Sequence, residues 1–188
     1  MFKHVAGAIV AATLAMPAFA ADLGGQIVNI GSDTTYPPHE FIEDGVVKGF
    51  DVDVVAAICE RINCQPNWIT TAWDGIFGAL ADGQFDMVVS GVTITEERDK
   101  IVDFSDPYII VQQGVLMRVE DAGKTIDDFK SGAMRLASQN GTTNAALGEE
   151  LVGRDNLALF DAFNNAVVAL QNGNGPIAFL EQPFDPRG

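Results

Sequence analysis

Residues 85–98 read FDMVVSGVTITEER, and this stretch indicates the fold class. Its opening, Phe85–Ser90, is a run dominated by Phe, Met and Val, the pattern expected of a central strand in a parallel sheet. A short polar segment follows, and Thr95 then opens a helical turn that starts with Glu96 and Glu97. A buried strand that leads through a polar loop into a helix is typical of α/β sheets.

Strands and helices alternate on both sides of this stretch. Upstream, the sequence predicts a strand at Gln26–Gly31 and then a hairpin at Phe41–Lys48, whose turn is Asp44-Gly45. A helix follows, with Asp51 as its N-cap and its end at about Ile62. The next elements are a strand at Asn67–Thr71 and a short helix with Asp74 as its N-cap. Downstream, it predicts a helix capped by Thr125 and Asp128, strands at Met134–Ala137, Leu157–Phe160 and Ile177–Leu180, and helices at Thr142–Leu151 and around Phe163–Leu170. Because the extended segment Pro107–Met117 separates the two series, we expect two α/β lobes with a cleft between them.

The composition excludes several classes of protein. The 188 residues are 47% apolar and 20% charged, unlike disordered or fibrous chains. The formal net charge of −15 would repel a phosphate backbone, so no nucleic-acid partner is expected. Met1–Ala20 has the basic start, the apolar run and the Ala18-Phe19-Ala20 cleavage pattern of a secretory signal peptide. No later apolar run reaches about eighteen residues, so we expect an exported product without stable membrane insertion.

Two cysteines, Cys59 and Cys64, are present. In an exported chain an even count favours a disulfide, with two free buried thiols as the alternative. One histidine, His39, follows the predicted signal peptide. We therefore expect no metal site, no cofactor and no Ser-His-Asp triad.

Polar side chains follow the predicted strands, where ligands of open α/β sheets bind. A purely structural role remains open for each of them, as a surface charge (Arg98), a helix cap (Thr142), a core aromatic (Trp73, Tyr36) or a turn residue (Asp33). Their common position at one edge of the sheets favours a binding site. The candidates are Ser32–Tyr36, Thr70–Trp73, Ser90–Thr93, Arg98, Asn140–Asn144 and Glu181.

Several motifs occur in a fixed order along the chain. They are Tyr36-Pro37-Pro38 with Phe41, Gly49-Phe50-Asp51-Val52-Asp53, Trp73-Asp74-Gly75-Ile76, Asp86–Arg98, Val102–Tyr108 and Gly141-Thr142-Thr143. From about Asn29 to Gly173 the chain thereby resembles the periplasmic polar-amino-acid-binding proteins, family 3 of the bacterial solute-binding proteins. The resemblance implies a two-lobed periplasmic-binding-protein-like fold of type II that closes on one amino acid. Lobe 1 would span residues 21–111 and lobe 2 residues 112–188.

The resemblance also implies how the ligand is held. Arg98 would bind the α-carboxylate, because its planar fork can donate two parallel hydrogen bonds. Thr93 and the backbone N–H groups near Thr142 and Thr143 would help, since helix N-termini favour anions.

The remaining candidates would surround the other end of the amino acid. Asp33 matches a position that faces the ligand side chain in binders of basic amino acids, which favours a polar or cationic ligand. The α-ammonium would meet the Ser90 hydroxyl, the Gly91 carbonyl and Glu181, while Tyr36 and Trp73 would flank the ligand side chain.

The chain departs from the family pattern in three places. His39 stands where the family usually has Phe, and we expect it at the rim of the site. Pro176 replaces an Asp, and an ungapped match puts Glu181 at the ammonium-binding acid. Members of the family continue beyond the equivalent of Gly188, so we expect a C-terminally truncated chain whose second lobe and return crossing are incomplete.

The sequence therefore predicts capture of an amino acid in the periplasm for the membrane permease of an ABC importer, without catalysis. An enzyme remains the alternative, because some periplasmic dehydratases that act on prephenate or arogenate share this fold. Such an enzyme needs a general acid, for which Glu181 and Asp33 are candidates. A soluble ligand-sensing module is the third hypothesis.

Overall fold

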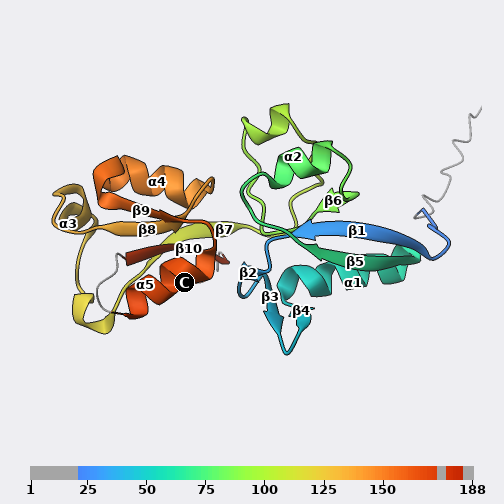
Figure 1. Ribbon diagram of the computed structural model, residues 1–188, viewed down its shortest axis with the longest axis horizontal. Helices are drawn as coiled ribbons and strands as arrows, with labels where there is room; N and C mark the ends of the chain where they lie inside the picture. Colours follow the sequence, from blue (N-terminus) through green and yellow to red (C-terminus); the bar gives the residue numbers. More distant parts are fainter. Residues whose placement is uncertain (1–20, 173–176, 184–188) are drawn as a thin grey trace, which may run out of the picture.

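The computed structural model describes residues 21–172 and 177–183, and it divides into two groups of elements side by side (Figure 1). The first is built on a parallel sheet of order β5-β1-β6, formed by β5 (Cys64–Thr70), β1 (Gln26–Ser32) and β6 (Met87–Val88). In register, Ser32 lies beside Thr70 and Ile30 beside Met87. The predicted signal peptide lies outside the described residues.

The prediction of a central strand at Phe85–Ser90 is wrong, because β6 has two residues and lies at the edge of the described sheet, with β1 in the centre. The apolar run has another cause. Phe85 is buried in the core beneath α2 (Ile76–Ala81), whereas Val89 is buried in the core beneath α1 (Phe50–Ile62). The segment is apolar because its side chains pack into the cores on both faces of the sheet, and not because it has a strand on each side.

The helix α1 begins two residues earlier than predicted, at Phe50, so Asp51 does not cap it. The N-cap is Gly49, whose φ of 134° is a conformation that residues with a side chain rarely adopt. A Cβ at this position would overlap the carbonyl oxygen of His39. Asp51 therefore lies inside the first turn, where it is fully buried and accepts the Gly91 N–H at 2.8 Å. The predicted cap at Asp74 is also wrong, since Gly75 precedes α2.

A small antiparallel sheet extends from the first group, formed by β2 (Thr35–Tyr36), β3 (Glu40–Glu43) and β4 (Val46–Lys48). The predicted hairpin is confirmed: β3 and β4 are joined by Asp44 and Gly45, both with positive φ. This sheet brings Tyr36 and Glu40 to the end of β1.

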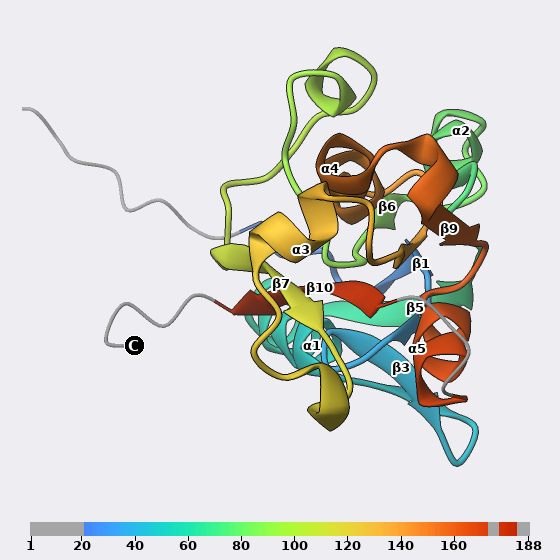
Figure 2. The same cartoon turned by 90° about the vertical axis from the view of Figure 1, so that its left-hand side faces the viewer.

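The second group is built on a sheet of order β7-β10-β8-β9, formed by β7 (Val111–Leu116), β10 (Ile177–Pro183), β8 (Leu136–Gln139) and β9 (Leu157–Phe160). The strands β8, β9 and β10 are parallel, and β7 is antiparallel to β10. The helices α4 (Thr143–Val152) and α5 (Phe163–Gln171) cover opposite faces of the sheet, with α3 (Ile126–Lys130) beside α4 (Figures 1 and 2). The predicted capping box of Thr125 and Asp128 is present at the start of α3.

Three short 3₁₀ helices complete the described chain: η1 (Arg98–Lys100), η2 (Val119–Asp121) and η3 (Arg154–Asn156). The chain passes from the first group to the second through the segment that leads into β7 (Figure 1). A lobe boundary after Val111 stays a prediction, and β7 begins at that residue. No helix among the described residues is long and apolar enough to span a bilayer.

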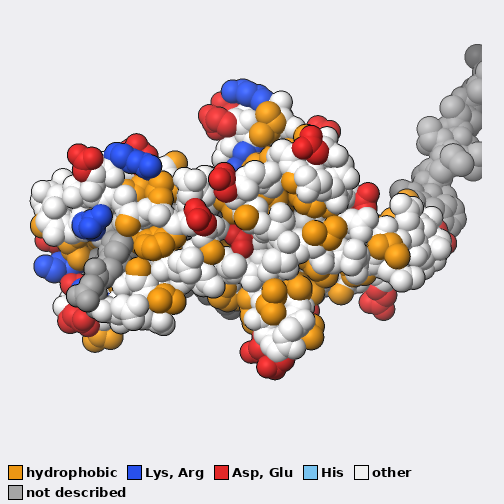
Figure 3. Space-filling model, in the orientation of Figure 1, with side chains coloured by type: hydrophobic (Ala, Val, Ile, Leu, Met, Phe, Trp, Pro, Cys, Tyr) orange, Lys and Arg blue, Asp and Glu red, His pale blue; other side chains and the backbone are white. Residues whose placement is uncertain are grey.

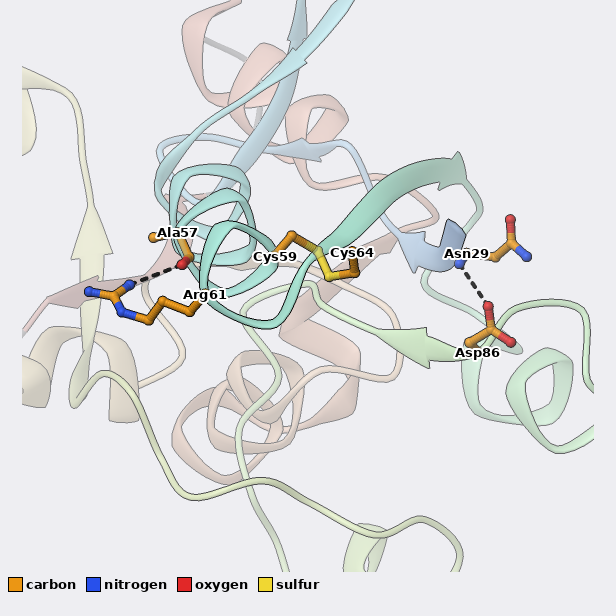
Figure 4. Close-up of a disulfide and its surroundings, with 6 residues drawn as sticks. All are labelled: Asn29, Ala57, Cys59, Arg61, Cys64 and Asp86. Atoms are coloured by element: carbon orange, nitrogen blue, oxygen red, sulfur yellow. Dashed lines mark hydrogen bonds between the residues drawn. A yellow bond between two sulfur atoms is a disulfide. The ribbon is translucent and has the colours of Figure 1, made fainter. Parts of the chain in front are cut away.

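The Cys59–Cys64 disulfide predicted from the sequence is present (Figure 4). Cys59 lies in the last turn of α1 and Cys64 is the first residue of β5. Between them Asn63 adopts the left-handed conformation, with φ 54°, and this reversal brings the two Cα atoms to 4.5 Å. The bridge ties the helix to the strand that it covers.

The surface in Figure 3 carries acidic side chains over both groups, interrupted by small apolar patches. The sequence as a whole is acidic, since its 26 Asp and Glu residues outnumber its 11 Lys and Arg residues.

Candidate functional site

One pocket lies where the two groups of elements meet, and it holds about 410 Å³ of space, part of which is open to solvent. Ten residues were predicted to bind a ligand, and nine of them line this pocket. They are Asp33, Tyr36, Trp73, Ser90, Gly91, Thr93, Arg98, Thr142 and Thr143.

The parallel strands of both sheets deliver these residues. Asp33 follows directly after β1, and Ser90 follows β6 by two residues. On the other side, Gln139 ends β8 and Phe163 begins α5 soon after β9. Because the carboxyl ends of the parallel strands in the two sheets face one another, side chains far apart in the sequence converge in one place.

Arg98 folds over the pocket instead of extending into solvent. Its Nη1 donates to the Thr93 carbonyl at 2.8 Å and its Nη2 to the Gly141 carbonyl at 3.3 Å. The guanidinium carbon lies 5.1 Å from the centre of the Trp73 ring and 5.5 Å from that of Phe77, within the range of cation–π contacts. The two rings and the two carbonyl groups hold the cation in a defined orientation.

The N-terminus of α4 lies beside Arg98. Thr142 caps this helix by accepting the Ala145 N–H at 3.1 Å, and its hydroxyl donates to the Gln139 carbonyl at 2.7 Å. Thr142 thus fulfils the structural role left open from the sequence and also lines the pocket. A helix N-terminus next to a guanidinium is a favourable environment for an anion.

Asp33 is buried and bridges the two groups of elements. Its Oδ1 accepts the Thr35 N–H at 3.2 Å and the Thr35 hydroxyl at 2.8 Å, which is the turn role considered from the sequence. Its Oδ2 accepts Nε2 of Gln139 at 2.5 Å, and the same amide donates to the Asp161 carbonyl. Gln139 was missed as a site residue, although it ends β8 directly before the candidate segment Asn140–Asn144.

Aromatic rings form the walls of the pocket. Tyr36 stacks on His39 with ring centres 5.3 Å apart and meets Phe163 edge-on at 4.9 Å. Trp73 is 8% exposed and belongs to the core beneath α2, yet it also lines the pocket. Phe163 was missed because sequence periodicity assigned it only to the apolar face of a helix.

The base of the pocket contains acids that the sequence did not single out as ligand contacts. Glu40 is fully buried, lines the pocket and accepts the Ser90 hydroxyl at 2.7 Å. Burial, together with the charge of nearby Asp51, raises the pKa of Glu40 to about 10. No signal in the sequence distinguished Glu40 from the acids of an exposed hairpin.

His39 is 1% exposed, so its predicted position at the rim is wrong. Its N–H donates to the Tyr36 carbonyl and its carbonyl accepts the Asp51 N–H, both at 3.0 Å. This turn directs the imidazole inward, between the rings of Tyr36 and Phe50 and with Nδ1 3.7 Å from Asp51 Oδ1.

Other parts of the predicted site are not described by the structure. Glu181 lies on β10 opposite Gln113, but its side chain lies outside the described residues, so its role stays a prediction. Pro176 also lies outside them. Within the described residues, no cluster of three or more His, Cys, Asp or Glu side chains is arranged to hold a metal ion.

Comparisons with known proteins agree with this geometry. A family model described as "Bacterial extracellular solute-binding proteins, family 3" matches residues 28–178. The chain is 32% identical to ABC transporter arginine-binding protein 1 of Escherichia coli (strain K12), covering 88% of this chain and 67% of that protein. It is 32% identical to the probable histidine-binding protein of Neisseria gonorrhoeae, covering 92% and 69%. It is 33% identical to the L-arginine-binding protein of Pseudomonas aeruginosa, and this match covers 75% of this chain and 55% of that protein.

Solved structures give the same picture. The arginine-, lysine-, histidine-binding protein ArtJ of Geobacillus stearothermophilus superimposes with a TM-score of 0.77 at 30% identity, covering 84% of this chain and 68% of that one. The ancestral amino-acid-binding protein AncCDT-1, described as a precursor of cyclohexadienyl dehydratase, gives a TM-score of 0.77 at 32% identity, covering 83% and 71%. The chain thus spans between about half and three quarters of the length of these relatives.

Proposed function

Since this chain belongs to the bacterial extracellular solute-binding proteins of family 3, we propose that it captures an amino acid outside the cytoplasm and presents it to the permease of an ABC importer. The observation that carries the proposal is the polarity of the pocket. A guanidinium, a helix N-terminus and the buried acids Asp33 and Glu40 all line the same pocket. This arrangement is complementary to a zwitterion.

Arg98 and the start of α4 bind the α-carboxylate. The guanidinium is already oriented by its hydrogen bonds to Thr93 and Gly141, so less side-chain entropy is lost on binding. Thr143, at the first turn of α4, adds a hydroxyl and a backbone N–H.

The α-ammonium lies at the base of the pocket, near Ser90 and Gly91. The Ser90 hydroxyl oxygen and the carboxyl of Glu40 both face this space. Glu181, on β10 of the other sheet, is proposed as the second-lobe acid.

The ligand side chain lies between Tyr36, Phe163 and Trp73 and reaches the buried pair of Asp33 and Gln139. A carboxylate and an amide at the end of an aromatic slot favour a polar or cationic side chain. The curated relatives named above are named for arginine and histidine, which agrees with this class.

Binding works by a shift in population between open and closed arrangements of the two lobes. The ligand contacts both lobes at once only when they are closed, so it stabilises the closed form, and the permease recognises that form. No chemical reaction is part of this proposal.

The test is a thermal-shift screen of the purified chain against the twenty amino acids. A ligand at 100 times its dissociation constant adds about 2.7 kcal/mol to the free energy of unfolding, which shifts the melting temperature by roughly 5–10 °C. We expect shifts with arginine, lysine, histidine or glutamine and none with glutamate or aspartate. Failure of every amino acid to shift the transition would contradict the proposal.

A dehydratase is the second candidate, favoured by the likeness to AncCDT-1. Incubation with prephenate distinguishes the two functions, because product formation requires a general acid in the pocket and occurs only in an enzyme. We expect no product.

A further inference from the structure

Three titratable side chains lie beneath the pocket, and we call His39, Glu40 and Asp51 the buried cluster. Their exposed fractions are 1%, 0% and 0%. His39 directly precedes β3, Glu40 is the first residue of β3, and Asp51 comes from the first turn of α1. Burying such groups is costly unless their partners are well placed, so their contacts are informative.

The buried cluster occupies the hydrogen-bond donors of the Ser90–Gly91 corner. The Ser90 hydroxyl donates its single proton to Glu40 Oε1 at 2.7 Å. The Gly91 N–H donates to Asp51 Oδ2 at 2.8 Å. Both donors therefore point away from the pocket.

What remains at this corner is an acceptor. A serine oxygen has two lone pairs, and one of those of Ser90 accepts the Asp33 N–H at 3.0 Å. Because Ser90 lines the pocket and its proton is bonded to Glu40, its oxygen can there accept a hydrogen bond but has no proton to donate. Such a corner accepts from an ammonium group and has no donor to offer a carboxylate or a carbonyl oxygen.

We propose that Glu40 and Asp51 are positioning residues, which act through Ser90 and Gly91 to make this corner selective for the ligand's α-ammonium group. The inference rests on the proposed function, since it specifies how the same pocket distinguishes an amino acid from the acid that lacks the amino group.

The charge state of the pair fits this role. Burial and the neighbouring Asp51 charge raise the pKa of Glu40, whereas Asp51 keeps a pKa below its usual value despite its burial, through polar contacts with His39, Gly91 and Glu40. Glu40 therefore holds a proton while Asp51 is ionised. Because Oε1 accepts from Ser90, the Glu40 proton resides on Oε2, and Ser90 keeps its acceptor orientation.

The experiment compares two probes, L-arginine and 5-guanidinopentanoate, which is arginine without its α-amino group. Calorimetry gives the ratio of their affinities. We expect the wild type to prefer L-arginine by roughly 100-fold or more, since loss of a hydrogen-bonding group from a site built for it is heavily penalised. If another amino acid gives the largest thermal shift, that amino acid and its des-amino acid take the place of this pair.

Variants of Glu40 distinguish a role in positioning the Ser90 hydroxyl from a role in stabilising the fold. Glu40→Leu releases the Ser90 proton toward the pocket, and we expect the ratio to fall about tenfold or more. Glu40→Gln should retain the ratio within about threefold, because its amide oxygen can accept from Ser90 as Glu40 Oε1 does. The matched control is Glu43→Gln, which removes an exposed acid of the same strand, paired with Lys48 at 2.6 Å, and should leave the ratio unchanged. If Glu40→Leu does not melt cooperatively, Glu40→Ala replaces it.

A measurement on the wild type needs no variant. The Gly91 amide should exchange its hydrogen slowly, because it is bonded to the buried Asp51 carboxylate. Fast exchange at Gly91, or an unchanged ratio in a folded Glu40→Leu protein, would overturn the inference while leaving amino-acid binding intact. Absence of binding by the wild type to all twenty amino acids would instead overturn the proposed function, and this inference with it.

Discussion

Arg98 shows how one side chain serves both the architecture and the ligand. It joins the two lobes through its bond to the Gly141 carbonyl while it lines the pocket. Its guanidinium packs on Trp73 and Phe77, so its position depends on a planar group and not only on its charge.

We predict that Arg98→Ala weakens binding of L-arginine by about 3–5 kcal/mol, because the enclosed carboxylate loses its cationic partner. Arg98→Lys should also bind poorly, since an ammonium cannot reproduce the fork or the stacking. Calorimetry measures both. The control is Arg154→Ala, an exposed arginine 3.8 Å from Glu149, which should bind as the wild type does. Unchanged affinity in Arg98→Ala would remove Arg98 from the site.

Glu40 makes the stability of the protein depend on pH. Its pKa is about 10 when folded and 4.5 in the absence of such surroundings. Between these values the folded protein holds a proton that the unfolded chain has released, so the free energy of unfolding falls as the pH rises, by at most about 1.4 kcal/mol per pH unit. The contribution is complete below pH 4.5 and is lost as the pH approaches 10.

We predict that Glu40→Gln, which cannot ionise, loses this dependence. The variant should gain stability relative to the wild type as the pH rises from 5 to 9. Urea denaturation at three pH values gives the difference in the free energy of unfolding between the variant and the wild type. Contributions of other titratable groups, which are common to both proteins, cancel in this difference. A constant difference between the two proteins across this range would show that Glu40 is not protonated in the folded state.

At the scale of elements, the disulfide joins the end of α1 to the start of β5 (Figure 4). We predict that the double variant Cys59→Ala/Cys64→Ala loses about 2 kcal/mol of stability, at the lower end of the usual range because the closed loop is short. Intact-mass measurement after alkylation without reductant checks the bridge itself. Two alkylated cysteines in protein purified from the periplasm would contradict it, and reductant should destabilise the wild type but not the variant.

The start of α1 depends on Gly49, because its φ of 134° and the nearby His39 carbonyl exclude a side chain. We predict that Gly49→Ala destabilises the fold by at least about 1–3 kcal/mol. Gly78, inside α2, has open space around its Cα, so Gly78→Ala should stabilise by about 0.5–1 kcal/mol. Thermal unfolding measures the change in stability of each variant. Equal changes in Gly49→Ala and Gly78→Ala would contradict the argument that the positive φ of Gly49 excludes a side chain.

At the scale of the whole molecule, the lobes meet through polar contacts across the pocket. Trp73 Nε1 donates to the Gly141 carbonyl at 3.0 Å, and Asp33 accepts from Gln139. These contacts favour the closed arrangement that the ligand requires. Removing one of them lowers the fraction of molecules that are closed, and the apparent dissociation constant rises by the same factor.

We predict that Trp73→Phe weakens L-arginine binding by roughly 2–10-fold, the value of one hydrogen bond, and enlarges the radius of gyration of the unliganded protein. Small-angle scattering and calorimetry test the two effects. Trp68→Phe is the matched control, because Trp68 lies on β5 and packs against the core under α1, away from the pocket. Equal behaviour of the two tryptophan variants would argue against closure through Trp73.

Local patterns in the sequence determined much of this protein. The β3–β4 hairpin follows from Asp44-Gly45, the start of α3 from the Thr125 and Asp128 pair, and the disulfide from the spacing of two cysteines. These features involve residues at most a few positions apart, so propensities and hydrogen bonds within the segment suffice to specify them. The ordered motifs, read through the family resemblance, also identified nine residues that line the pocket.

Only the tertiary structure decided which polar residues are buried and what they contact. Glu40 and Ser90 are 50 residues apart, and Asp33 and Gln139 are 106 residues apart. Nothing in the local sequence of His39 or Glu40 distinguishes a buried side chain from an exposed one, and the apolar run around Val88 did not reveal that its strand lies at an edge. The physical reason is that burial and pKa depend on every element packed around a group, and those neighbours are known only once the chain has folded.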